Sequence, residues 1–180
     1  MRLNKYLARA GFASRRKCDQ VIASGQVNVN GEIITDYSYK VSSKDVVVFK
    51  NKAVSLEDEQ YSLYLVNKPK GYICSNAKDN KNRVVDLIRS KSRLYTVGRL
   101  DVNTTGAILV TNDGDLANKL SHPSYDREKK YLVRTFIDIP KEKYLQLKKG
   151  LNIGRRQKAK GLIKRIKKEN KHIYWEVTLT

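Results

Sequence analysis

Apolar residues at the start of the chain recur at helical intervals. Residues 3–10 place one apolar face along a helix that Gly11 is expected to end. Ser14 can cap a second helix over residues 15–24, and Gly25 is a natural stop for it. The pattern therefore predicts two short helices separated by a glycine turn.

Strand-like alternation follows the second helix. Residues 27–29 alternate apolar and polar side chains, and the apolar pair at residues 33–34 predicts the returning strand. Between them, Asn30-Gly31 tolerates positive φ at both positions, which is typical of a hairpin turn. Residues 46–49 predict one more short strand.

A change of composition divides the chain. Residues 51–60 carry three consecutive acidic side chains in a basic chain, which predicts a linker between domains over residues 1–50 and 61–180. In the longer domain we expect strands at 61–66, 95–97, 107–111, 131–139 and 173–179, and helices at 116–120 and 141–149. Few helices and many non-adjacent strands favour an α+β fold with a mixed, largely antiparallel sheet.

The formal net charge of +19 in 180 residues exceeds what solubility requires. Such a surplus is typical of proteins that bind a polyanion, either nucleic acid or an anionic membrane. No apolar run approaches the ~20 residues of a spanning helix, and the N-terminus lacks a secretory signal. We therefore expect a cytoplasmic protein that binds nucleic acid and no membrane, although compositional drift towards Lys and Asn can account for part of the charge.

The positive charge is concentrated in two stretches. Residues 1–50 hold nine Lys or Arg against four Asp or Glu, and residues 141–171 hold thirteen against two. In the first stretch Arg15, Arg16 and Lys17 stand at a helix start, where backbone N–H groups also favour phosphate. Each stretch is either a surface that binds nucleic acid or a solvated face.

The cysteines and histidines do not suggest a metal site. Cys18 and Cys74 are far apart, and adding His122 and His172 completes no zinc-ligand spacing. Reduced thiols in or near packed elements are expected instead.

One loop combines residue types that carry chemistry. Residues 98–106 lie between two β-rich segments and place Arg99, Asp101 and two threonines between glycines. Loops on rigid scaffolds are common positions for functional sites. Two interpretations remain open from the residues alone: a reactive carboxylate, or an Asp101 that caps a turn and pairs with Arg99.

The first fifty residues resemble the small RNA-binding module first seen in ribosomal small-subunit protein four. The matching segments, in order, are Arg2-Leu3-Asn4-Lys5-Tyr6-Leu7, Ser14-Arg15-Arg16 and Val29-Asn30-Gly31. In that family two helices present a basic face to the backbone of folded RNA. The resemblance implies RNA contacts from Lys5, Arg9, Arg15, Arg16 and Lys17.

The remainder of the chain resembles the RsuA-type bacterial pseudouridine synthases. The matching segments are Lys68-Pro69-Lys70-Gly71, Gly98-Arg99-Leu100-Asp101 with Thr104 and Gly106, and His122-Pro123 followed by Lys130-Tyr131. The resemblance implies isomerisation of a specific uridine in ribosomal RNA, with large-subunit RNA slightly favoured. Asp101 would be the catalytic nucleophile or base, and Tyr131 would lie against the target uracil. Further contacts to the flipped nucleotide or the RNA backbone would come from Arg99, Thr104, Lys68 and Lys70.

The implied reaction rearranges one nucleotide, so neither a cofactor nor a metal is expected. The partner would be ribosomal RNA in precursor or partly assembled subunits, and the protein would be a monomer. The family continues beyond the equivalent of Thr180 with a segment that supplies an Arg to the catalytic acid, so a C-terminally truncated catalytic domain is expected. The alternative is a catalytically impaired RNA-binding protein or ribosome-assembly factor.

Overall fold

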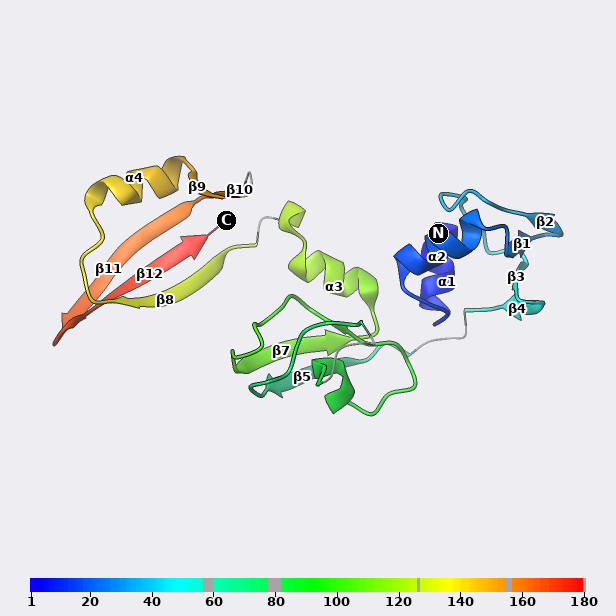
Figure 1. Ribbon diagram of the computed structural model, residues 1–180, viewed down its shortest axis with the longest axis horizontal. Coiled ribbons are helices and arrows are strands. Elements are labelled where there is room, and N and C mark those ends of the chain that lie inside the picture. Colours follow the sequence, from blue (N-terminus) through cyan, green and yellow to red (C-terminus); the bar gives the residue numbers. More distant parts are fainter. Residues whose placement is uncertain (57–59, 78–81, 126, 155–156, 180) are drawn as a thin grey trace. The chain divides into compact units, whose positions relative to one another are not determined.

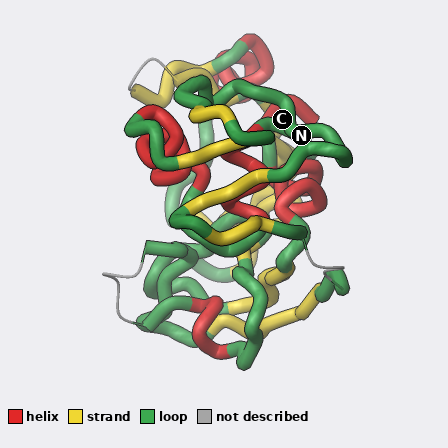
Figure 2. Tube along the Cα trace, turned by 90° about the vertical axis from the view of Figure 1, so that its right-hand side faces the viewer, coloured by secondary structure: helices red, strands yellow, loops and turns green. Residues whose placement is uncertain are grey.

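The chain forms two compact units, Met1–Ala117 and Asn118–Thr180, and each is described by itself. The structure is a computed structural model that describes residues 1–56, 60–77, 82–125, 127–154 and 157–179. Figure 1 labels most of the helices and strands, and Figure 2 shows the loops that join them. Short helices together with antiparallel sheets confirm the expected α+β fold.

Two helices open the first unit as predicted. α1 (Leu3–Arg9) is followed by Gly11 at φ +84°, a conformation that ends a helix at little cost in glycine. α2 (Arg15–Ala23) begins after Ser14, whose Oγ accepts a hydrogen bond from the Lys17 N–H at 3.3 Å. The capping residue and the glycine stop predicted from the sequence are therefore both confirmed.

A four-stranded antiparallel sheet follows, in the order β2-β1-β3-β4. Its strands are β1 (Val27–Val29), β2 (Glu32–Ile33), β3 (Val47–Phe49) and β4 (Lys52–Val54). Asn30 and Gly31 have φ of 54° and 93°, which confirms the predicted hairpin turn between β1 and β2.

β4 lies inside the expected linker, residues 51–60. It pairs with β3 because Lys50 and Asn51 adopt positive φ, 51° and 59°, and reverse the chain in a tight turn. The sheet therefore extends into the first residues of the expected linker. The acidic residues 57–59 lie outside the described residues.

The helices and this sheet share one apolar core. Its most buried members come from both helices and from the central strands: Leu3, Leu7, Ile22, Val27 and Val47. Cys18 lies in the same core, and burial raises the pKa of its thiol. The module thus has a hydrophobic centre of its own.

A second antiparallel sheet in the first unit has the order β5-β7-β6. Its strands are β5 (Leu63–Lys68), β6 (Tyr95–Thr96) and β7 (Gly106–Thr111), and the 3-10 helix η1 (Val84–Leu87) lies between β5 and β6 in the sequence. Val84, Leu94, Ile108 and Val110 form its buried core. The loop between β6 and β7 contains Asp101.

The second unit is built on the antiparallel sheet β11-β12-β8. Its elements are β8 (Lys129–Thr135), α4 (Lys141–Lys149), β9 (Leu151–Gly154), β10 (Gln157–Ala159), β11 (Gly161–Glu169) and β12 (His172–Leu179). The helix α3 (Gly114–Ser121) and the 3-10 helix η2 (Pro123–Tyr125) precede them. Trp175 is fully buried, its indole N–H donates to the Thr135 hydroxyl at 2.8 Å, and the Tyr144 ring of α4 meets it edge-on.

β8 ends at Thr135, so the prediction of a strand over 131–139 was wrong for its last four residues. The partner strand β12 begins at His172, and Ile173 already pairs with Thr135. Only His172 of β12 lies beyond this pair, and its ring contacts Phe136, so β12 has no residue opposite positions 137–139. The Thr135 hydroxyl instead donates to the Ile137 carbonyl at 2.7 Å, within a bend.

Candidate active site

The loop that carries Asp101 is shaped by two glycines. Gly98 and Gly106 have φ of 73° and 137°, values that L side chains rarely adopt. The Thr104 N–H donates to the Asp101 carbonyl at 3.0 Å and closes a tight turn. The Asp101 side chain is exposed, so its carboxylate is accessible to a macromolecular substrate.

Lys68 fastens this loop from inside the protein. It is 0% exposed, and its Nζ donates to the carbonyls of Thr104, Val102 and Pro69 at 2.7, 3.2 and 3.2 Å. A buried ammonium group is costly unless acceptors replace its water, and here three carbonyls do so. The Gly71 N–H adds a second bond to Val102, at 2.9 Å.

This burial corrects the expected role of Lys68. Lys68 was predicted to contact the RNA backbone, but a fully buried ammonium group with three carbonyl partners does not face a phosphate. The neighbouring Lys70 is exposed and is free to serve as a backbone contact.

The residue before Asp101 is fastened as well. Leu100 packs against the core of the β5-β7-β6 sheet, and its N–H donates to the Cys74 Sγ at 3.3 Å. Asp101 therefore lies between Leu100, which is anchored in the core, and Val102, which is held by Lys68. The backbone is held on both sides while the carboxylate stays outside, an arrangement that suits a pre-organised catalytic group.

Arg99 and Thr104 are both exposed at the same loop. Within the described ranges, Arg99 forms no ion pair with Asp101 or with another carboxylate. The alternative in which Asp101 serves only as the ionic partner of Arg99 therefore gains no support. Both side chains can reach a ligand in front of the loop.

Tyr131 lies on β8, in the second unit. Its side chain is 46% exposed, and it stands opposite Val177 of β12. Asp101 belongs to the first unit, so the approach of Tyr131 to the reacting nucleotide stays a prediction.

The basic side chains of the N-terminal module fall into two groups. Arg15, Arg16 and Lys17 are exposed at the start of α2. Lys5 instead forms an ion pair with Asp115 at 2.6 Å, and Arg9 donates to the Tyr61 hydroxyl at 2.5 Å and stacks over its ring. The α2 cluster is thus the more available of the two for RNA.

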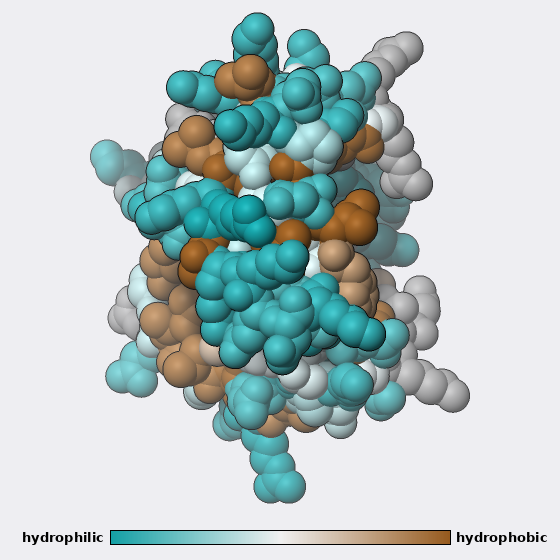
Figure 3. Space-filling view, turned by 90° about the vertical axis from the view of Figure 1, so that its left-hand side faces the viewer, coloured by the Kyte–Doolittle hydropathy of each residue, from teal (hydrophilic) through white to brown (hydrophobic). Residues whose placement is uncertain are grey.

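The second basic stretch is also partly engaged within the protein. Arg165 pairs with Asp138 at 3.3 Å, and Lys167 pairs with Glu169 at 2.7 Å. Arg155 and Arg156, its other dense run, lie outside the described residues. In the space-filling view of Figure 3, hydrophilic side chains make up most of the visible surface, with hydrophobic side chains between them.

Two features of this region were missed from the sequence. The Cys74 thiol accepts a hydrogen bond next to Asp101, which its position in the chain gave no reason to expect. Arg83 and Arg93 line a pocket before β6, and the alternating run Arg89-Ser90-Lys91-Ser92-Arg93 was a signal that could have identified it.

Two further observations concern metals and membranes. Among the described residues, no group of three or more His, Cys, Asp or Glu side chains is arranged to hold a metal ion. No helix in the described part of the chain has the length and apolar character needed to cross a membrane.

Family models match both parts of the chain. The model described as RNA pseudouridylate synthase matches residues 62–180, and the S4 domain model matches residues 1–47. In the solved crystal structure of a pseudouridylate synthase, a similar fold covers 98% of this chain and 76% of that one. The TM-score is 0.55 and the sequence identity is 26%.

Curated relatives give the same picture. "Ribosomal large subunit pseudouridine synthase B" of Bacillus subtilis is 41% identical over 155 residues, which cover 84% of this chain and 62% of the relative. "Putative ribosomal large subunit pseudouridine synthase SVR1, chloroplastic" of Arabidopsis thaliana is 39% identical over 83% of this chain and 40% of the relative. An uncharacterized RNA pseudouridine synthase of Aquifex aeolicus is 34% identical over 99% of this chain and 72% of its own length. The chain thus spans less than two thirds of the first two relatives.

Proposed function

The chain belongs to the RNA pseudouridylate synthase family, with an S4 domain before the synthase region, and from this we propose that it isomerises a specific uridine of ribosomal RNA to pseudouridine. The observation that carries the proposal is the exposed Asp101 on a loop whose backbone is fastened on both sides. Large-subunit RNA is the favoured substrate because the Bacillus and Arabidopsis relatives are named as large-subunit enzymes.

In the proposed reaction the Asp101 carboxylate acts at the ribose–uracil bond as a nucleophile or a base. The bond between the ribose and the uracil nitrogen breaks, the uracil turns in place, and a bond from the ribose to a uracil carbon replaces it. That carbon loses its proton and the freed nitrogen gains one, so atoms and electrons balance within one nucleotide. Covalent catalysis would divide this difficult exchange into easier steps.

The target uridine must leave the base stack before it reaches Asp101, at a cost of a few kcal/mol. We propose that Tyr131 offsets part of this cost, since stacking of a base on an aromatic ring contributes about 1–3 kcal/mol. Arg99 and Thr104 would hold the flipped nucleotide, and Lys70 with the exposed α2 cluster would hold the RNA backbone. Lys68 would act only through the loop that it fastens.

The replacement Asp101→Asn tests the proposal. We expect it to abolish pseudouridine formation in ribosomal RNA fragments, as mapped by sequencing, and to leave RNA affinity within a few-fold because phosphate contacts dominate that affinity. Asp36→Asn, which removes the same charge from an exposed turn of the S4 module, should retain activity.

Equal turnover by wild type and Asp101→Asn would contradict the catalytic assignment. RNA binding by the wild type with no modification of any ribosomal fragment would favour the alternative of a binding or assembly factor.

A further inference from the structure

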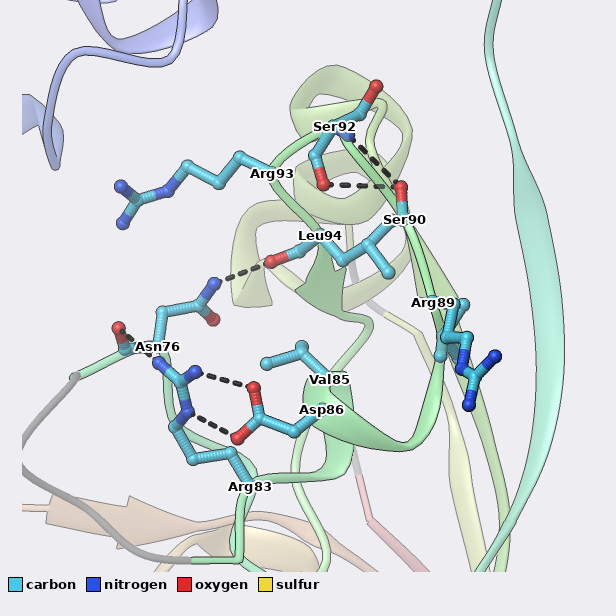
Figure 4. Close-up of a pocket in the computed structure, with 10 residues that line it drawn as sticks. Asn76, Arg83, Val85, Asp86, Arg89, Ser90, Ser92, Arg93 and Leu94 are labelled. Carbon is cyan, nitrogen blue, oxygen red and sulfur yellow. Dashed lines mark hydrogen bonds and ion pairs between the residues drawn. The ribbon is translucent and has the colours of Figure 1, made fainter.

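A pocket with a volume of about 330 Å³ lies between η1 and the segment that leads into β6 (Figure 4). Three arginines line it, Arg83, Arg89 and Arg93, and its only carboxylate in the part of the chain that is described is Asp86. Serine and asparagine side chains complete the polar lining. The pocket is thus positively charged, and it lies apart from the loop that carries Asp101.

Both carboxylate oxygens of Asp86 accept hydrogen bonds from Arg83. Arg83 donates from Nε and Nη2 to the two Asp86 oxygens, at 2.7 and 2.5 Å, and from Nη1 to the Asn76 carbonyl at 3.5 Å. The hydrogen bond from Arg83 lowers the pKa of Asp86, which stays ionised. A guanidinium has five N–H groups, so Arg83 is held rigidly and still has two left to donate.

Arg93 contributes charge that nothing in the described residues neutralises. It forms no ion pair there, and its guanidinium lies over the Tyr95 ring, 5.8 Å from the ring centroid. In Figure 4 the Arg93 and Arg83 guanidinium groups lie on the same side of the pocket with Asn76 between them, whereas Arg89 extends the other way. The guanidinium groups of Arg83 and Arg93 therefore border the same side of the pocket.

The pocket and the Asp101 loop share one hydrophobic core. Leu94, which lines the pocket, and Leu100, which precedes Asp101, both pack in the core of the β5-β7-β6 sheet. Asp101 is seven positions after Leu94, so their Cα atoms lie at most about 25 Å apart. A helical RNA strand advances roughly 3.4 Å per nucleotide, so about seven nucleotides or fewer of such a strand span this distance.

We propose that this pocket binds one phosphate group of the substrate RNA, held between the guanidinium groups of Arg93 and Arg83, near the uridine on which Asp101 acts. Planar guanidinium groups match the oxygens of a phosphate and bind it through paired hydrogen bonds. The inference rests on the proposed function, because that function makes RNA the substrate. It adds a contact that fixes where the strand enters the site.

The replacement Arg93→Ala tests the contact by RNA binding at several salt concentrations. We expect affinity to fall about three- to tenfold and the slope of log affinity against log salt to flatten by about 1. Arg93→Gln, which keeps a polar group but removes the positive charge, should do the same, and urea unfolding should show both variants folded. Lys91→Ala is the matched control, because Lys91 is exposed, two residues away and outside the pocket lining.

Equal weakening by Lys91→Ala and Arg93→Ala would overturn the proposal, since it would indicate a diffuse electrostatic effect. If Arg93→Ala changed neither pseudouridine formation nor RNA affinity, the phosphate-binding proposal would be contradicted and the proposed function would stand. If the wild type bound RNA through Arg93 but modified no RNA, the pocket proposal would stand and the proposed function would be contradicted.

The source of the phosphate is resolved by titrating inorganic phosphate, uridine monophosphate and a short single-stranded RNA against the arginine side-chain N–H signals in NMR spectra. We expect the Arg83 and Arg93 signals to move with the RNA at far lower concentration than with the two small anions. Movement at equal concentrations, or no movement with any of the three, would contradict an RNA phosphate site.

Discussion

At the scale of single residues, burial decides between two uses of lysine. Lys68 and Lys70 stand in one short segment, and the family resemblance implied an RNA contact for both. Lys68 ends β5 opposite Gly106, where its ammonium group meets the carbonyls of the Asp101 loop. The motif was recognisable in the sequence, but this role depends on strand pairing that no local pattern encodes.

The two lysines should therefore differ when each is replaced by methionine. We expect Lys68→Met to leave the loop carbonyls without their donor, to lower the free energy of unfolding by about 2–3 kcal/mol, and to reduce kcat. Lys70→Met should keep stability and kcat and weaken RNA binding modestly. Urea unfolding and steady-state kinetics check both variants, and a Lys68→Met protein that loses only RNA affinity would contradict the fastening role.

At the scale of helices and strands, the sequence predicted the elements that have local signals. The cap at Ser14, the stop at Gly11 and the Asn30-Gly31 hairpin were all correct because each depends on backbone preferences of the residues themselves. The strand β4 inside the expected linker and the early end of β8 were missed for another reason, because the extent of a strand depends on the strand beside it. Pairing between distant residues is absent from any local window.

A turn in the S4 module is expected to make the stability of the protein depend on pH. Asp45 accepts hydrogen bonds from the Ser42 N–H at 2.8 Å and from the Asn30 amide at 3.0 Å, and chiefly the Ser42 bond lowers its pKa. A carboxyl with a lowered pKa in the folded state stabilises it above the unfolded pKa of about 3.9, and this contribution is lost as pH falls through the folded value.

We therefore expect Asp45→Asn to melt below wild type at pH 7, with the difference shrinking towards pH 3. Thermal melts followed by circular dichroism across this range provide the measurement, and Glu32→Gln, an exposed acid on β2, serves as the control. A difference in Tm that stays constant with pH would show that Asp45 acts through its shape and not through its charge.

At the scale of the whole molecule, the net charge of +19 is a sum of unlike contributions. Several cations are paired within the protein, as Lys5 is with Asp115, whereas Arg15 and Arg16 are exposed at the start of α2. Composition predicted a polyanion partner but could not separate these groups. For the same reason the sequence could name Asp101 and Tyr131 as site residues without fixing the distance between them.

The exposed cluster should dominate the response of binding to salt. Reversing charge at Arg15 and Arg16 together should weaken RNA binding and flatten the salt slope by about 1–2, because fewer counterions are released. The same reversal at Lys5 and Arg9 should flatten the slope less, since both side chains already have partners. Filter binding from low to moderate salt provides the comparison, and equal slopes for the two double variants would contradict it.

The burial of Trp175 has a practical consequence. The chain has one tryptophan and eleven tyrosines. The Trp175 indole donates to the Thr135 hydroxyl and contacts the Tyr144 ring. Light emitted by the indole of the unlabelled protein therefore comes from one known place in the second unit, while backbone dichroism averages over both units. A researcher who follows the two signals side by side can see whether the halves of the molecule come apart together or in turn, with no dye attached.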